Sequence, residues 1–217
     1  MKKVFNLMVV DESGSMSIIR KQAFEGLNET LETVKKMQET HSELEQHITL
    51  MTFDSTHRSF IYDNVLASNA KKLEWNQYNP GGATPLYDAI GLGISKVNAI
   101  AGKDDEVLVT IITDGEENCS TEYSLAMIKN LIEKLKEQNW TFTLIGTENL
   151  DVESMAVQMS IENHLAFKED AAGTNAMFEL ERKSRINYCD NLAFDACCAP
   201  EEVEMRKKAR RGKFFKG

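Results

Sequence analysis

Two apolar runs that each end in an aspartate most restrict how this chain can fold. The run Val4–Val10 is short and rich in β-branched residues, and it stops at Asp11. The run Val107–Thr113 has the same character and stops at Asp114. Continuous apolar runs of this length are typical of strands buried on both faces of a parallel sheet. Because parallel strands end at one edge of their sheet, both aspartates are expected at that edge.

The rest of the pattern predicts alternating helices and strands. Apolar residues recur at helical spacing in the segments 24–34, 86–100, 125–135 and 175–188, and a short helix is expected at 152–159. Further strands are expected at 47–53, 57–62, 140–145 and 164–167. Only Asp54, Ser55 and Thr56 separate the first two of these strands, so they must form an antiparallel hairpin. The chain is therefore predicted to be an α/β protein with a doubly wound, mostly parallel six-stranded sheet in the order 3-2-1-4-5-6.

The predicted domain covers residues 1–188, and residues 189–217 form a C-terminal extension in which the periodicity fades. Seven lysines and arginines lie in Arg206–Lys216, so the rest of the chain is more acidic than the formal net charge of −9 indicates. We expect this basic tail to be solvated or to fold back on the acidic body. Binding of nucleic acid or of an anionic surface through Arg206–Lys216 is the alternative.

Composition favours a globular protein of the cell interior. The chain is 42% hydrophobic and 27% charged, and no apolar stretch approaches the roughly 18 residues that a membrane span needs. Lys2 and Lys3 precede an apolar run, but Asn6 interrupts it, which favours a strand over a signal peptide. The four cysteines form no C-x-x-C pair, which predicts reduced thiols and a cytoplasmic location.

A turn-rich loop, residues 79–85, leads into the helix expected at 86–100. Thr84 is expected to cap that helix and Pro85 to occupy its first position. In a sheet of the predicted order, this loop overhangs the crevice between the first and fourth strands, where Asp11 and Asp114 end. The Thr84 hydroxyl is therefore expected in the same crevice as the two carboxylates.

Five oxygen-bearing side chains from three segments are thus predicted to meet: Asp11, Ser13, Ser15, Thr84 and Asp114. Taken singly, each has a simpler structural role, because serine, threonine and aspartate are common at helix starts and in turns. Their joint placement at the switch point of the sheet instead favours a metal site. Hard oxygen ligands that converge on one point suit a small divalent cation such as Mg²⁺.

The segments 11–15 (DESGS), 82–90 (GATPLYDAI) and 112–118 (ITDGEEN) resemble the three parts of the metal-ion-dependent adhesion site of von Willebrand factor type A domains. The resemblance covers roughly residues 3–188. It implies a Rossmann-like fold that binds Mg²⁺ or Mn²⁺ and uses the ion to hold an acidic side chain, Asp or Glu, of a partner protein. By this resemblance Ser13, Ser15 and Thr84 ligate the ion directly, whereas Asp11 and Asp114 act largely through water. Intracellular relatives resemble scaffolds, which implies a scaffold or adaptor role.

A Mg²⁺-dependent phosphoryl-transfer enzyme or phospho-acceptor domain is the rival hypothesis, since Asp11 and Glu12 are adjacent acids after the first strand. Haloacid-dehalogenase-like phosphatases carry a second aspartate where this chain has Ser13, and receiver domains carry a lysine where it has Gly146-Thr147. The phosphate-binding motifs G-x-x-x-x-G-K-[ST] and G-x-G-x-x-G do not occur. The sequence therefore predicts a binding module and not an enzyme.

Overall fold

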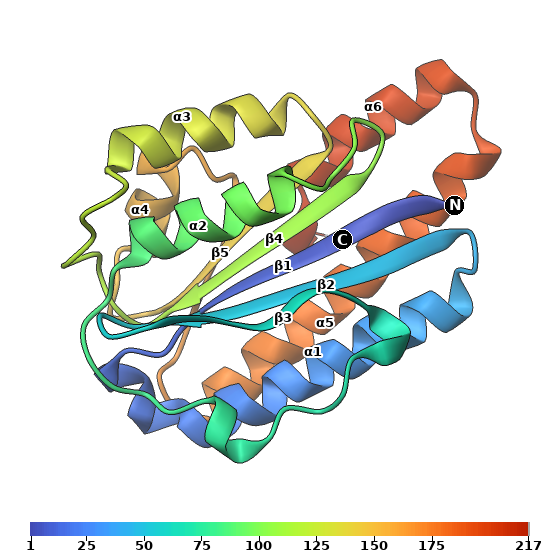
Figure 1. Ribbon diagram of the computed structural model, residues 1–217. Helices are drawn as coiled ribbons and strands as arrows, with labels where there is room; N and C mark the ends of the chain where they lie inside the picture. Colours follow the sequence, from blue (N-terminus) through green and yellow to red (C-terminus); the bar gives the residue numbers. More distant parts are fainter. Residues whose placement is uncertain (217) are drawn as a thin grey trace.

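The first apolar run forms β1 (Lys2–Asp11), a central strand of the sheet in the computed structural model, which describes residues 1–216. The other strands are β2 (Leu44–Phe53), β3 (Arg58–Leu66), β4 (Glu106–Thr113), β5 (Trp140–Thr147) and β6 (Asn163–Phe167). They pair in the order β3-β2-β1-β4-β5-β6 (Figure 1). All neighbours are parallel except β2 and β3, which form the antiparallel hairpin. The predicted sheet, its strand order and its one antiparallel pair are confirmed.

Helices cover both faces of the sheet. Helices α1 (Arg20–Thr40) and α5 (Ala171–Phe194) lie on one face, and α2 (Leu86–Asn98), α3 (Leu125–Lys136) and α4 (Val152–Gln158) lie on the other (Figure 1). Alternate residues of β1 serve the two layers: Leu7 and Val9 pack with α2, whereas Met8 and Val10 pack with α1 and α5. An apolar run without polar alternation is required because both faces of this strand are buried.

The helix after the turn-rich loop begins within the predicted segment, but the roles expected for Thr84 and Pro85 at its N-terminus differ from those observed. Helix α2 starts at Leu86, and Pro85 is its N-cap residue. The Pro85 side chain makes no capping hydrogen bond. The expectation that Thr84 caps this helix is therefore wrong. Side chains from another loop satisfy the first helical N–H groups instead: Glu117 accepts from Tyr87, and Ser120 accepts from Asp88.

The last predicted helix is longer at its C-terminal end, because α5 continues six residues beyond Tyr188. Cys189 and Leu192 are buried in these two turns. Two buried apolar residues are too few to show helical spacing in the sequence. The predicted boundary between 188 and 189 falls inside this helix. The division of the chain there stays a prediction.

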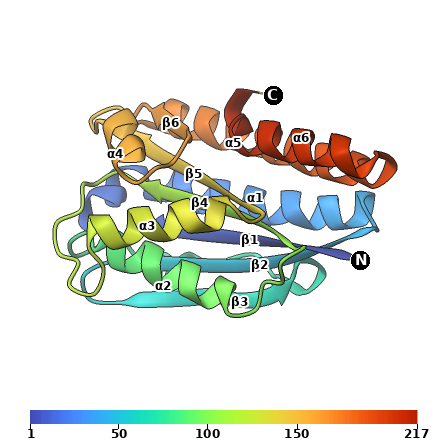
Figure 2. The ribbon, with the colours of Figure 1, turned by 90° about the horizontal axis from the view of Figure 1, so that it is seen from above.

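The C-terminal segment folds back on the body. Helix α6 (Pro200–Arg211) lies beside α5 in Figure 2, and the turn after it buries Phe214 in the core. Of the two expectations for the basic tail, the structure shows the one in which it folds back, and its three arginines make internal contacts: Arg206 and Arg210 bond Asp195, and Arg211 bonds the Lys136 carbonyl. The Lys216 side chain and Gly217 lie outside the described residues. Among the residues described, no helix combines the length and apolar character needed to cross a bilayer.

Candidate metal centre

The two aspartates lie on neighbouring strands, as the sequence predicts. Asp11 is the last residue of β1, and Asp114 directly follows β4, which pairs with β1. Asp11 is fully buried, and both of its carboxylate oxygens are engaged. Its Oδ2 accepts a hydrogen bond from Thr113 Oγ1 at 2.6 Å, and its Oδ1 accepts one from the Ser13 N–H at 2.7 Å. Asp11 is therefore held rigidly at the edge of the sheet.

The serine hydroxyls join the first loop to Asp114. Ser13 Oγ and Ser15 Oγ lie 3.3 Å apart, and Ser15 Oγ donates to Asp114 Oδ1 at 2.8 Å. Ser13 precedes a short 3₁₀ segment, but its side chain forms no capping hydrogen bond there. The contacts therefore do not support the alternative in which Ser13 simply caps a helix. The second oxygen of Asp114, Oδ2, is buried and has no hydrogen-bond partner among the described residues.

The third segment brings Thr84 beside Asp114. A Cβ added at Gly115 would lie 2.8 Å from Thr84 Oγ1, so only glycine fits at that position without displacing the threonine. Asn118 fixes the Thr84 backbone, accepting from its N–H at 2.9 Å and donating to its carbonyl at 3.2 Å. The Gly14 N–H also donates to the Gly82 carbonyl at 3.1 Å, which joins the loop of the two serines to the loop of the threonine. All five predicted oxygen-bearing residues therefore lie in one region.

Burial dominates the electrostatics of the site, and among the described residues no cation forms an ion pair with Asp11 or Asp114. Burial raises the pKa of Asp114 to about 6; the Ser15 hydrogen bond opposes that shift, and the nearby Asp11 and Glu169 carboxylates add to it. Burial also raises the pKa of Asp11, against the hydrogen bonds from Thr113 and Ser13. Burying two acids close together is unfavourable unless a cation balances them.

Glu12 does not join Asp11, contrary to what an acidic phosphoryl-transfer pocket requires. Its carboxylate accepts from the Asn79 N–H, and its Oε2 lies 3.0 Å from His57 Nε2. The other ring nitrogen of His57 lies 3.0 Å from Asp54 Oδ1. We call Glu12, Asp54 and His57 the carboxylate–histidine clasp. Sequence reasoning missed it because Glu12 and His57 are 45 residues apart and no motif links them.

A second carboxylate outside the predicted set organises the loop after β4. Asp88 is fully buried at the start of α2 and accepts hydrogen bonds from three successive backbone N–H groups, those of Thr121, Glu122 and Tyr123, at 2.8–3.0 Å. Burial raises the pKa of Asp88, but these three bonds and the Arg58 guanidinium 3.5 Å away together lower it below its usual value. Asp88 thus holds the segment that follows Asp114 against α2.

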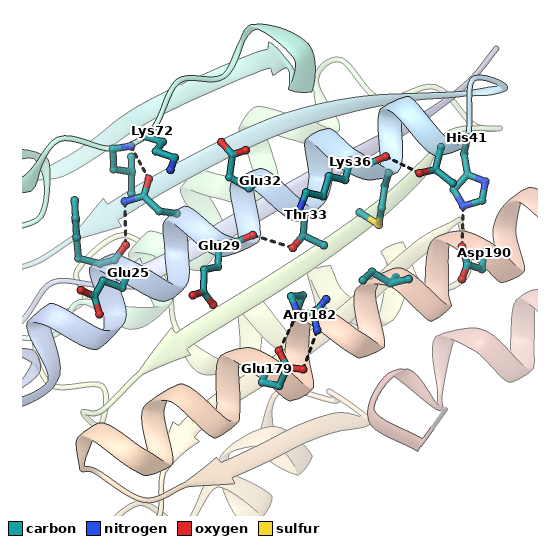
Figure 3. Close-up of a pocket in the computed structure, with 16 residues that line it drawn as sticks. Glu25, Glu29, Glu32, Thr33, Lys36, His41, Lys72, Glu179, Arg182 and Asp190 are labelled. Carbon is teal, nitrogen blue, oxygen red and sulfur yellow. Dashed lines mark hydrogen bonds and ion pairs between the residues drawn. The ribbon is translucent and has the colours of Figure 1, made fainter.

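Two observations concern where in the described residues a ligand or an ion could bind. Among the described residues, no group of three or more His, Cys, Asp or Glu side chains is placed to hold a metal ion, whereas the five predicted site residues offer two carboxylates and three hydroxyls. A large groove of about 770 Å³ does exist between α1 and α5, but none of the five site residues lines it (Figure 3). Glu29, Arg182 and His41 are among the side chains that line this groove.

Comparison with known protein families decides the family. The family model described as von Willebrand factor type A domain matches residues 7–180. The chain belongs to this family. Domains of the family are in general protein-interaction modules and often bind a divalent metal at a metal-ion-dependent adhesion site. The family predicted from the three sequence motifs is thereby confirmed. No curated protein matched the sequence.

Solved structures support the fold of this von Willebrand factor type A domain. The chain is similar to the PilB minor pilin from Streptococcus sanguinis, with 13% identity, a TM-score of 0.57 and coverage of 86% of this chain and 61% of the pilin. It is similar to the SpRpn10 VWA domain, with 14% identity, a TM-score of 0.58 and coverage of 83% and 95%. It is also similar to proximal thread matrix protein 1 from the mussel byssus, whose structure has zinc in its MIDAS motif; the identity is 13%, the TM-score 0.57, and the coverage 85% and 46%.

These likenesses establish the fold and nothing finer, since the identities are low. The chain spans less than two thirds of the pilin and less than half of the byssus protein.

Proposed function

We propose that this chain is a metal-dependent protein-binding module in which a divalent cation at the site of Asp11, Ser13, Ser15, Thr84 and Asp114 holds an acidic side chain of a partner protein. The observation that carries the proposal is the buried Asp114 Oδ2, which has no hydrogen-bond partner among the described residues and lies in the region of three hydroxyl-bearing residues. An unpaired buried carboxylate oxygen is costly, and a cation nearby offsets that cost.

The residues present fit a small hard cation. Ser13, Ser15 and Thr84 would offer neutral hydroxyl oxygens as direct ligands, and Asp11 and Asp114 would act largely through water. Mg²⁺ and Mn²⁺ prefer oxygen ligands and keep several waters, which suits so few charged groups. The byssus protein has zinc in its MIDAS motif, and the proposal of Mg²⁺ or Mn²⁺ for this chain depends on the oxygen ligands of the site.

The protein part of the mechanism follows from the charges. Hydroxyls neutralise no charge, so a bound ion would keep most of its attraction for an incoming carboxylate. Asp11 is fixed by Thr113 and the Ser13 backbone, so it can hold position while the partner binds. The Thr84 loop is tied to both neighbouring loops, so partner binding and the position of that loop are expected to be coupled.

We further propose an intracellular scaffold or adaptor role in the cytoplasm, with no catalytic activity. Four free cysteines support a reducing compartment: Cys119, Cys189, Cys197 and Cys198. The rival phosphoryl-transfer function is disfavoured because Glu12 belongs to the carboxylate–histidine clasp and does not form an acid pair with Asp11.

The test is isothermal titration of MgCl₂ and MnCl₂ into the full chain. The wild type should bind one ion, and the Ser13→Ala/Ser15→Ala variant should bind it at least about ten-fold more weakly, since two ligands are lost. Ser17→Ala is the matched control, because Ser17 lies in the same segment but its hydroxyl bonds the Gly14 carbonyl and not the carboxylates. Equal heats in the wild type and the double variant would remove the proposed site.

Partner binding is tested separately by affinity capture from lysate. Proteins held by the wild type should be released by a chelator and should not be held by the Ser13→Ala/Ser15→Ala variant. Capture that neither treatment changes would contradict a metal-dependent interaction.

A further inference from the structure

A hollow of about 220 Å³ lies between the start of α2, the loop after β4 and helix α4, at the end of the sheet that carries the metal centre (Figure 1). Its charged lining residues are Glu116, Glu117 and Asp151, and no described lysine, arginine or histidine lines it. Glu116 and Asp151 are exposed and Glu117 is half-buried, so an incoming group can reach the first two carboxylates from solvent. A hollow lined by carboxylates alone raises the local concentration of cations.

No cation among the described residues forms an ion pair with these three carboxylates. The cations of the nearby loops pair elsewhere: Arg58 Nη1 lies 2.9 Å from Glu122, and Lys168 Nζ lies 2.8 Å from Asp170. A partner that brought only an acidic side chain to the metal centre would meet this uncompensated negative charge, and like charges repel. A positive group on the partner would offset that repulsion.

The hollow suits a long cationic side chain better than a metal ion. Among the described residues, no three carboxylate, imidazole or thiol groups are placed to hold one ion, so these three acids do not converge on a point. Glu117 Oε1 accepts from the Ser120 N–H at 2.6 Å, and its Oε2 accepts from the Tyr87 N–H at 2.9 Å. Asp151 Oδ1 accepts from the Ser154 N–H at 3.0 Å as the cap of α4. Arginine carries several separated donors, which can reach carboxylates that lie apart.

The walls of the hollow match an arginine side chain in kind and in size. Tyr87 and Met155 line it, and both are half-buried, so each keeps part of its apolar surface accessible. Burial raises the pKa of the Tyr87 hydroxyl, and the Glu117 and Glu116 carboxylates raise it further, which places both charges near this ring. A guanidinium can stack on an aromatic ring while it bonds carboxylates at its edge. Pockets for whole small molecules are typically about 300–1,000 Å³, so a smaller hollow suits a single side chain.

The hollow and the metal centre share two chain segments. Glu116 lies two residues beyond Asp114, so their Cα atoms are at most about 7 Å apart. Tyr87 lies three residues beyond Thr84, and the two segments meet at Gly115, where an added Cβ would lie 2.8 Å from Thr84 Oγ1. Asp114 Oδ2 is buried and has no hydrogen-bond partner among the described residues, which is a separate sign that this loop meets a ligand.

We propose that the hollow binds an arginine side chain of the same partner protein whose acidic side chain lies at the metal centre. This assignment rests on the proposed function and adds the chemistry of the partner to it. The shared segments also limit the spacing on the partner. Alternate residues of a strand are about 7 Å apart, and residues four apart on a helix are about 6 Å apart. The acidic residue and the arginine should therefore lie within about four residues of each other.

The experiment is a peptide array probed with the full chain in MgCl₂. Each peptide has a central glutamate and one arginine placed at each other position in turn, in a background of glycine and serine. The wild type should bind best where the arginine lies within four residues of the glutamate. The Glu116→Gln/Asp151→Asn variant should lose this preference and still bind in a Mg²⁺-dependent way. Asparagine at 151 can keep the cap of α4, so this variant is expected to fold.

The matched control is Glu153→Gln, because Glu153 is an exposed acid in the first turn of α4 that does not line the hollow. Fluorescence polarisation then compares the best array peptide with a version that carries citrulline, which is uncharged, in place of arginine. The dissociation constant of the wild type and of Glu153→Gln should rise at least about three-fold with citrulline. That of Glu116→Gln/Asp151→Asn should not change, because the two losses remove one interaction.

The possible results separate this inference from the proposed function. Mg²⁺-dependent binding of glutamate peptides with no preference for arginine would overturn the inference alone. Binding that neither a chelator nor Ser13→Ala/Ser15→Ala changes would overturn both. An equal loss of arginine preference in Glu153→Gln would show diffuse attraction to an acidic edge and no hollow that recognises arginine. Thermal midpoints of the variants without peptide distinguish lost binding from lost folding.

Discussion

Asp114 is the residue whose protonation should report on the metal centre. Its pKa is about 6 in the folded chain, against 3.8 for an ordinary aspartate. The folded state therefore holds this proton more tightly than the unfolded state does between these values, so stability falls as pH rises through that window. Above about pH 6 the full penalty is present, and below about pH 4 it is absent.

We predict that, in a chelator, the thermal midpoint of the wild type falls relative to that of Asp114→Asn as the pH is raised from 4.5 to 7. The variant has no carboxylate to titrate at this position, so the difference isolates Asp114. Added Mg²⁺ should raise the wild-type midpoint at pH 7, because a ligand that binds only the folded state stabilises it. Parallel pH profiles for the two proteins would show that the Asp114 pKa is not raised.

A second residue-scale prediction concerns the ion pair beneath α5. Arg185 is fully buried; it bonds Glu181, and it also bonds Asn6 at 2.7 Å and Thr110 at 3.0 Å. Arg185→Met would leave the Glu181 carboxylate buried without a counter-charge. We expect the free energy of unfolding to fall by about 3–5 kcal/mol, measured by urea denaturation.

The control for this prediction lies on the same helix. Arg182 pairs with Glu179 on the exposed side of α5, so Arg182→Met should cost less than about 1 kcal/mol. The double variant Arg185→Met/Glu181→Leu should regain much of the lost stability, because it removes both charges. A loss for Arg185→Met as small as that for Arg182→Met would contradict this prediction.

At the scale of elements, the carboxylate–histidine clasp joins the turn between β2 and β3 to the metal-site loops. Glu12 bonds His57 of that turn through its side chain, and its backbone carbonyl accepts from the Gly81 N–H at 2.8 Å. The same residue thus contacts the turn and the loop that carries Thr84, and it lies between Asp11 and Ser13. Movement of the turn should therefore alter the metal site.

We predict that His57→Ala weakens Mg²⁺ binding about three- to ten-fold, although His57 is not a ligand, because a supporting hydrogen bond contributes about 1 kcal/mol. Glu12→Gln should weaken it too, and the effects of the two substitutions should not add, since both break one contact. His41→Ala is the control, because His41 pairs with Asp190 away from the site. Additive effects on Mg²⁺ affinity would show that the two residues act independently.

The sequence alone predicted the helices and strands and the five oxygen-bearing residues, because both depend on local patterns. Apolar runs identified β1 and β4, and the strand order placed Asp11 and Asp114 at one edge. It did not find the contacts that hold the site together. The partnership of Asn118 with the Thr84 backbone depends on how two loops pack, and so do the contacts of Glu117 and Ser120 with the first N–H groups of α2. Such contacts leave no periodic signal in the sequence.

At the scale of the whole molecule, the C-terminal segment packs against the rest of the domain and is not a free tail. The sequence shows a cluster of positive charges there, and charge alone does not tell a solvated tail from a docked one. The C-terminal segment is held by individual contacts. Phe214 is buried in the core, and Arg210 donates to Asp195 at the end of α5. Neither contact has a short-range signature in the sequence.

We predict that deleting residues 200–217 lowers the thermal midpoint while leaving Mg²⁺ affinity unchanged. The deletion exposes the surface that Phe214 covers and leaves Asp195 without its two arginines, which together should cost at least about 3 kcal/mol. The metal-site residues lie at the opposite ends of β1 and β4 from the residues that α6 contacts, Glu106 among them, so their geometry should persist. Phe214→Ser in the full chain should reproduce part of the loss. An unchanged midpoint in both variants would show that residues 200–217 are an independent appendage, and a loss of Mg²⁺ binding in parallel with stability would show that the segment supports the site.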